Sequence, residues 1–173
     1  VVVGVRIHYV QGLLDISGTN RMPLRTRITD GLKTAMREKD ATRLSTLRLI
    51  SAAIKDQDIA ARAKGNADGV GEGEVLAILG KMVKQRQESA RAYEEGGRLE
   101  LAEKEREEIG VIEDFLPRQL SDAEVAKAVN DAISATGADS IRDMGKVMGA
   151  LKAKYTGQMD FGAVGPQVRD RLV

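Results

Sequence analysis

The 173-residue chain has balanced charge, with 27 lysine and arginine residues against 26 acidic ones, and only 3% of its residues are aromatic. Binding to nucleic acid through overall net charge alone is therefore excluded, and any such role needs a local basic patch. The chain has no cysteine, which excludes disulfides and thiolate metal sites, and no apolar run of the roughly 18 residues that a membrane span requires. We expect a cytoplasmic protein.

The first 21 residues differ in composition from the rest of the chain. They are rich in β-branched residues and nearly uncharged, and Met22 follows them as a natural start would. The basic beginning and small-residue cleavage site of a signal peptide are missing. We expect residues 1–21 to form a disordered extension upstream of the fold. The only histidine, His8, lies there, so neither a Ser-His-Asp site nor a histidine zinc site can be assembled.

Two helices are predicted directly after Met22. In the first, Leu24, Ile28 and Leu32 recur at helical spacing. The second follows Asp40, whose carboxylate suits an N-cap, and it ends before Gly65. The following segment, GNADGVGEG at residues 65–73, is expected to be a mobile loop or hinge. A phosphate-cradling loop is disfavoured, because no strand precedes it and no Gly-Lys-Ser/Thr follows it.

Two more helices complete the predicted N-terminal domain. The third runs from about residue 74 to 95 and stops at a pair of glycines. The fourth places Leu99, Ala102 and Ile112 on its buried stripe and ends at Pro117. Residues 22–117 are therefore expected to form a helical hairpin or bundle.

A small three-helix module is predicted for residues 118–173. Ser121 and Glu124 form a capping box at its start. Ser140 is expected to cap the next helix, whose buried stripe is Ile141, Met144, Val147, Met148, Leu151 and Tyr155. The last helix is expected to begin at Pro166, because a proline would break a helix already under way. The predicted fold class is all-α.

No catalytic group, cofactor site or metal site is predicted. Ser45, Ser51 and Lys55 are the one serine–lysine combination considered, but a serine and a lysine four residues apart on an exposed helix are ordinary. The carboxylates of the run EKEREE at residues 103–108 are expected on a solvated helix face, where their pKa values stay ordinary. The chain is not expected to be an enzyme by itself.

Two basic clusters are the candidate nucleic-acid contacts. The central cluster lies in the third predicted helix and consists of Lys81, Lys84 and Arg86, with Arg91 nearby. The C-terminal cluster consists of Arg142, Lys146, Lys152 and Lys154. Both could bind phosphates; the alternative is that they are ordinary solubilising charges paired with nearby acids.

Two glycines stand four residues apart inside the penultimate predicted helix. Gly145 and Gly149 each cost about 1 kcal/mol relative to alanine in a helix interior. Close packing of a second helix is the preferred explanation. The alternative is a surface that an RNA backbone or a partner chain approaches closely.

Four strings of residues, in this order, resemble the GatB/YqeY family. They are STLRLISAAIKDQDI (45–59), KMVKQRQESARAYEEGGRLELAEKEREEI (81–109), VIEDFLPRQLS (111–121) and DMGKVMGAL (143–151). The resemblance covers residues 22–173 and implies a helical hairpin domain followed by a module similar to the tail of the GatB subunit of glutamine-dependent tRNA amidotransferase. The chain departs from the family pattern in YTGQMDFGAVGPQV, residues 155–168.

The resemblance implies a role in tRNA binding or association with the amidotransferase. The family's implied activity is that of a carbon–nitrogen ligase with glutamine as amide donor, but the chain lacks the Ser-Ser-Lys amidase site and the kinase-like domain which that chemistry uses. We therefore expect an accessory protein that binds tRNA, and the alternative is a protein-interaction adaptor without an RNA role. Neither a membrane nor a metal is an expected partner.

Overall fold

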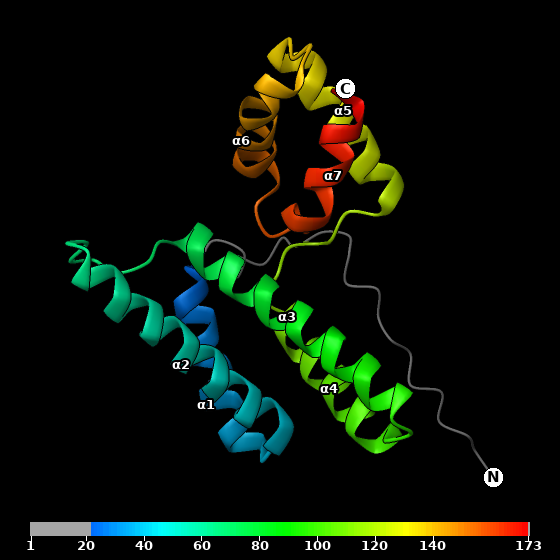
Figure 1. Ribbon diagram of the computed structural model, residues 1–173. Helices are drawn as coiled ribbons and strands as arrows, with labels where there is room; N and C mark the ends of the chain where they lie inside the picture. Colours follow the sequence, from blue (N-terminus) through cyan, green and yellow to red (C-terminus); the bar gives the residue numbers. More distant parts are fainter. Residues whose placement is uncertain (1–21, 173) are drawn as a thin grey trace.

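A computed structural model describes residues 22–172, and the expected extension at residues 1–21 lies outside this range. Within it the fold is all-α, without β-strands, as predicted. The lower part of Figure 1 holds four helices: α1 (Leu24–Glu38), α2 (Ala41–Ala63), α3 (Glu72–Glu95) and α4 (Leu99–Glu113). The upper part holds α5 (Asp122–Thr136), the 3-10 helix η2 (Ile141–Asp143), α6 (Met144–Tyr155) and α7 (Phe161–Arg171).

The lower part consists of two helical hairpins that share one apolar core. The α1–α2 and α3–α4 hairpins meet mainly where α2 packs against α4. Leu47 and Ile50 of α2, Leu79 of α3 and Ile112 of α4 are fully buried there. Asp40 accepts a hydrogen bond from the backbone N–H of Arg43, which confirms its predicted role as the N-cap of α2.

Phe115 fixes the end of α4 against the first hairpin. Its ring lies so close to Gly31 that a Cβ there would come within 3.2 Å of the ring and 3.3 Å of Leu47. Arg27 and Arg43 lie over the ring, with guanidinium carbons 5.6 and 5.7 Å from its centroid. A larger residue at position 31 would have to displace the Phe115 ring or Leu47 by a few tenths of an ångström.

The loop between α2 and α3 is anchored, although we expected a mobile hinge. Asp58 of α2 accepts a hydrogen bond from the backbone N–H of Val70 at 2.9 Å, and Arg25 donates to the Val70 carbonyl at 2.8 Å. The side chain of Val70 is buried in the core. Gly69 has a φ of +79°, and a Cβ there would collide with the Asp58 carboxylate. This close approach accounts for the glycine at position 69.

The upper part has an apolar core of its own. Val129 of α5, Val147 and Leu151 of α6, and Val168 of α7 are fully buried. Ser121 and Glu124 form the predicted capping box at the start of α5. The two cores have no buried residue in common. Division into domains of residues 22–117 and 118–173 stays a prediction.

The expected start of the last helix is wrong. Helix α7 begins at Phe161, capped by Asp160, and Pro166 lies inside it. A proline in a helix conflicts with the carbonyl four residues before it and with the Cβ of the preceding residue. Because Gly165 has no Cβ, the second conflict disappears and the helix continues through Pro166.

Two side chains assigned to buried stripes are exposed instead. Ile141 is 49% exposed and belongs to η2, and Ser140 makes no side-chain capping bond at its start. Leu99 is 67% exposed at the beginning of α4. Both residues lie in the first turn of a helix. Helical periodicity does not show whether a neighbouring helix extends far enough to cover that turn.

Candidate nucleic-acid interface

Helix α6 presents a bare, basic face to solvent. Its opposite side buries Val147 and Leu151 against α5 and α7. Gly145 and Gly149 therefore point outward, together with Lys146 and Lys152. Two positions about one turn apart on this face therefore carry no side chain, and lysines lie beside them.

Close packing does not explain the two glycines of α6, so our preferred explanation is wrong. A Cβ built on Gly145 or on Gly149 would have no heavy atom within 4 Å apart from the helix's own backbone. No other described helix crosses α6 at this face. A glycine interior to a helix costs about 1 kcal/mol relative to alanine, and nothing within the described fold offsets that cost.

The four cations of the C-terminal cluster differ in their partners. Lys146 donates to Asp143 at 2.7 Å, which raises the pKa of the lysine and lowers that of the carboxyl group. Lys154 lies 5.3 Å from the centroid of the Tyr155 ring. Arg142 and Lys152 are exposed and make no ion pair within residues 22–172. The cluster therefore keeps cations that a phosphate could engage.

The three members of the central cluster, Lys81, Lys84 and Arg86, do not form one basic surface, because they point to different places. Arg86 is turned toward α4, where its Nε donates to Glu108 at 2.9 Å; each of the two side chains is only 13% exposed. Arg86 also donates to the Met82 carbonyl at 3.3 Å. Its guanidinium stabilises the α3–α4 hairpin.

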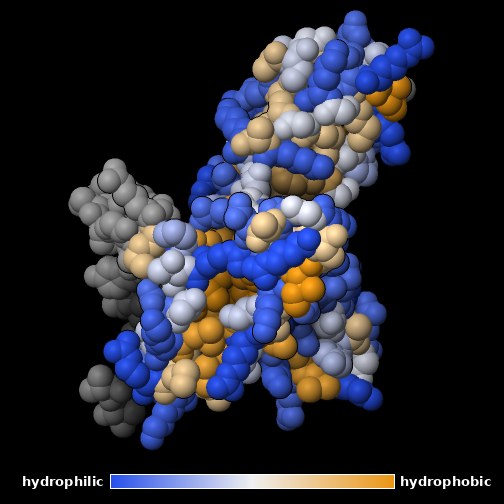
Figure 2. All heavy atoms as spheres, turned by 90° about the vertical axis from the view of Figure 1, so that its left-hand side faces the viewer, coloured by the Kyte–Doolittle hydropathy of each residue, from blue (hydrophilic) through white to orange (hydrophobic). Residues whose placement is uncertain are grey.

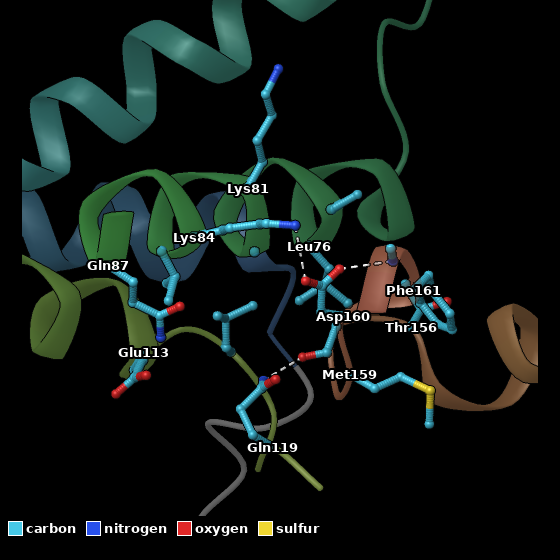
Figure 3. A pocket seen from close by; sticks show the side chains of 16 residues that line it. Leu76, Lys81, Lys84, Gln87, Glu113, Gln119, Thr156, Met159, Asp160 and Phe161 are labelled. Atoms are coloured by element: carbon cyan, nitrogen blue, oxygen red, sulfur yellow. Dashed lines mark hydrogen bonds and ion pairs between the residues drawn. The ribbon is translucent and has the colours of Figure 1, made fainter. Parts of the chain in front are cut away.

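Lys84 joins the two parts of the molecule. Its ammonium lies 3.1 Å from the Asp160 carboxylate at the start of α7. Burial disfavours the charged form of Asp160, but hydrogen bonds from Lys84 and from the Gly162 backbone N–H outweigh burial, so the pKa of Asp160 is lowered. In Figure 3 Lys84 extends toward Asp160, whereas Lys81 extends away from the other labelled side chains. Lys81 is exposed and has no ion-pair partner among the described residues.

A cavity of about 580 Å³ lies where the two parts meet. Leu76 and Leu116 of the lower part line one side of the cavity, and Met159 and Phe161 of the upper part line the other. Gln119 lies beside it and donates to the Gly157 carbonyl at 2.6 Å (Figure 3). The cavity lining and this hydrogen bond were missed from sequence, because no periodic pattern connects residues that are so far apart in the chain.

The described residues contain no arrangement that indicates catalysis. Ser45 and Ser51 donate hydrogen bonds to carbonyls of their own helix, at 3.0 and 2.9 Å, and Lys55 is exposed. Within residues 22–172, no group of three or more metal-ligating side chains could hold a metal ion. At the end of α4, outside the run at residues 103–108, burial and then the charge of Asp114 raise the pKa of Glu113.

No helix between residues 22 and 172 is both long and apolar enough to cross a lipid bilayer. The helices instead differ in their charge. Helix α6 has three lysines and no acidic residue, whereas α4 has six glutamates against one lysine and one arginine. From sequence we noted the basic cluster and the acidic run at residues 103–108 separately, and counting charges helix by helix would have shown how far the two helices differ.

Comparisons with known proteins match nearly all of the described chain. The family model described as "Yqey-like protein" matches residues 25–172. The chain is 32% identical over 139 residues to "Altered inheritance of mitochondria protein 41, mitochondrial" of Meyerozyma guilliermondii, covering 79% of this chain and 64% of that protein. It is 38% identical over 85 residues to the protein of the same name from Clavispora lusitaniae, covering 49% of this chain and 46% of that protein.

These relatives correct one of our expectations. Both are mitochondrial by name, which contradicts the cytoplasmic location that we inferred from the absence of cysteine. An absence of cysteine fits any reducing compartment and cannot distinguish between them. In both comparisons the chain spans less than two thirds of the relative's length.

Proposed function

Because the chain belongs to the Yqey-like protein family, we propose that it is an accessory RNA-binding protein whose α6 face contacts the phosphates of tRNA. The observation that carries the proposal is the pair of open glycines, Gly145 and Gly149, beside exposed cations. Phosphate oxygens are bound by lysine and arginine side chains and by backbone groups, and a glycine surface lets the helix backbone come close to them.

The chemistry of the α6 face suits a polyanion better than a protein surface. Lysines carry compact, fully hydrated charges that meet phosphates as point charges. The exposed side of α6 bears no large apolar or aromatic side chain that could serve as a binding anchor in a protein interface. The expected contacts are Arg142, Lys146, Lys152 and Lys154.

The proposed partner system is tRNA amidation, which rests on the resemblance to the GatB tail. The chain would contribute recognition of tRNA, while a partner enzyme supplies the chemistry. Purified chain given glutamine, ATP and charged tRNA should therefore produce no amide above background.

A titration with bulk tRNA tests the proposal. Labelled tRNA, followed by fluorescence anisotropy at about 50 and 200 mM salt, should bind the wild-type chain with an affinity that falls steeply as salt rises. Replacing both Gly145 and Gly149 with leucine blocks the close approach without changing any charge, and should weaken binding roughly tenfold, about 1.4 kcal/mol. Gly110→Leu is the matched control, because Gly110 is also an open helix glycine but lies on acidic α4.

A protein-interaction adaptor is the second candidate, and one observation favours it. Leu99 and Leu101 at the start of α4 are 67% and 40% exposed on an otherwise acidic helix. Exposed leucines of this kind suit a protein partner with a basic, apolar surface. Replacing both with serine should abolish recovery of a protein partner in affinity purification if this candidate is correct, and should leave tRNA binding unchanged.

A further inference from the structure

Charge is sorted between the helices of this chain. Helices α1 and α2 together carry eight lysine and arginine residues against four acidic ones. Helix α5 carries three acidic residues against one lysine, and α4 is more acidic still. The excess of positive charge on the basic helices (α1, α2 and α6) is thus offset by the excess of negative charge on the acidic helices (α4 and α5).

The basic helices lie on one side of the molecule. In Figure 1, α6 forms the left edge of the upper part, and α2 with α1 behind it forms the left of the lower part. The acidic helices α4 and α5 lie to the right. Figure 2 looks onto the left side, where hydrophilic side chains cover both parts and hydrophobic side chains surround a hollow in the lower part.

A line of cations runs along the exposed face of α2. Arg48, Lys55 and Arg62 recur every seven residues, so they share one face at intervals of about 10 Å. All three are exposed, and none forms an ion pair within the described residues. Arg62 donates to the Ala67 carbonyl at 3.3 Å, and Asp56 is the acidic neighbour of this line.

We infer that the exposed face of α2 is a second phosphate-binding surface, so that one RNA lies across both parts of the molecule and contacts Arg48, Lys55 and Arg62 as well as α6. The inference rests on the proposed function. Its basis is charge complementarity, since regularly spaced cations on a helix that lies on the same side of the molecule as α6 match a polyanion that extends past a single helix. The acidic helices α4 and α5 lie on the opposite side of the molecule, where their negative charge repels RNA, so the RNA approaches from the basic side.

The experiment compares two triple variants of the full chain. Arg48→Gln, Lys55→Gln and Arg62→Gln remove the α2 line, while Arg98→Gln, Lys104→Gln and Lys127→Gln remove the same charge from the acidic side. Affinity for tRNA is measured by anisotropy over a salt series. For each variant, circular dichroism must match the wild-type spectrum, and glutamine is chosen because it preserves helix propensity.

The α2 variant should bind tRNA at least tenfold more weakly at low salt. Its slope of log affinity against log salt should be shallower by roughly 2, as expected for three lost phosphate contacts at about 0.7 each. The control variant should keep the wild-type slope. If the wild-type chain binds tRNA and the α2 variant keeps its slope, the inference is wrong and the proposed function stands. If the wild-type chain binds no tRNA, both fall.

A lipid surface is the alternative partner for the exposed face of α2, since Leu49 and Ile59 are exposed near the line of cations. Vesicles with and without anionic phospholipid distinguish the two. The inference expects no association with either vesicle at protein concentrations that saturate tRNA. Association with anionic vesicles that the α2 triple variant abolishes would overturn the assignment to RNA.

Discussion

Glycines in this chain have opposite roles, which only their surroundings distinguish. Gly31 is tightly covered by Phe115. Gly157 has a φ of +77°, which strains any other residue, and Leu76 and Pro117 lie within 3.4 Å of a Cβ built there. Gly145 and Gly149 face open space. The sequence reveals that a helix contains glycines, but it does not reveal whether another chain segment covers them.

Replacing Gly145 or Gly149 with alanine should therefore stabilise the fold. Alanine is favoured in a helix interior by about 1 kcal/mol, and there is nothing for its methyl group to strike. Urea unfolding followed by circular dichroism measures the change in unfolding free energy. Gly31→Ala is the comparison and should destabilise, because its Cβ would press on Phe115. A loss of stability at both α6 positions would restore the packing explanation.

Asp58 should make stability depend on pH in the acid range. Hydrogen bonds from Arg25 and then from the Val70 backbone N–H lower the pKa of Asp58 to about 2. Because the folded-state pKa lies below the unfolded value near 3.9, the stabilisation is fully present above pH of about 4 and is lost as the pH falls toward 2.

Urea unfolding of the wild-type chain and of Asp58→Asn between pH 2 and 6 tests this dependence. The difference in unfolding free energy should be constant above a pH of about 4 and should shrink below it, since the wild-type carboxylate becomes protonated there. A difference that stays the same over the whole range would show that Asp58 has no lowered pKa.

At the scale of helices, sequence periodicity predicts where a helix lies better than it predicts which side chains of two helices contact each other. The amphipathic stripes of α2 and α5 and their caps at Asp40 and Ser121 are confirmed. The pairing of Arg86 with Glu108 could not be predicted, because the two residues are 22 positions apart and face each other only once α3 and α4 pack together. Sequence therefore identified a basic cluster but not which of its members are free.

Removing either Arg86 or Glu108 alone should lower the free energy of unfolding. Arg86→Met would leave the largely buried Glu108 without its partner, and we expect a loss of roughly 3 kcal/mol in unfolding free energy. Replacing both, as Arg86→Met with Glu108→Leu, should recover most of this loss. Chemical denaturation of the two single variants and the double variant provides the cycle. Additive losses would contradict the assigned pairing.

At the scale of the whole molecule, two cores are joined by few contacts. Lys84 pairs with Asp160, and a Cβ built on Gly157 of the upper part would lie within 3.4 Å of Leu76 and Pro117 of the lower part. The capping box after Pro117 is confirmed as the start of α5, while the division into domains at that point stays a prediction. The side on which each helix exposes its charge was not predictable from the sequence, because it depends on how the hairpins pack.

The upper core should fold without the lower one. A fragment of residues 118–173 contains all the buried residues of that core, from Val125 to Leu172. We expect a helical spectrum and a cooperative thermal transition, at a lower temperature than in the full chain because so small a core is marginal. A fragment without helical signal would show that the modules depend on each other.

Lysine acetylation of the chain with and without tRNA, read by mass spectrometry, tests the central claim most directly. Binding through the basic side predicts that tRNA protects Lys55, Lys146 and Lys152, while Lys104 and Lys127 on the acidic helices react at unchanged rates. Equal reactivity of all five lysines in saturating tRNA, or protection confined to Lys104 and Lys127, would contradict it.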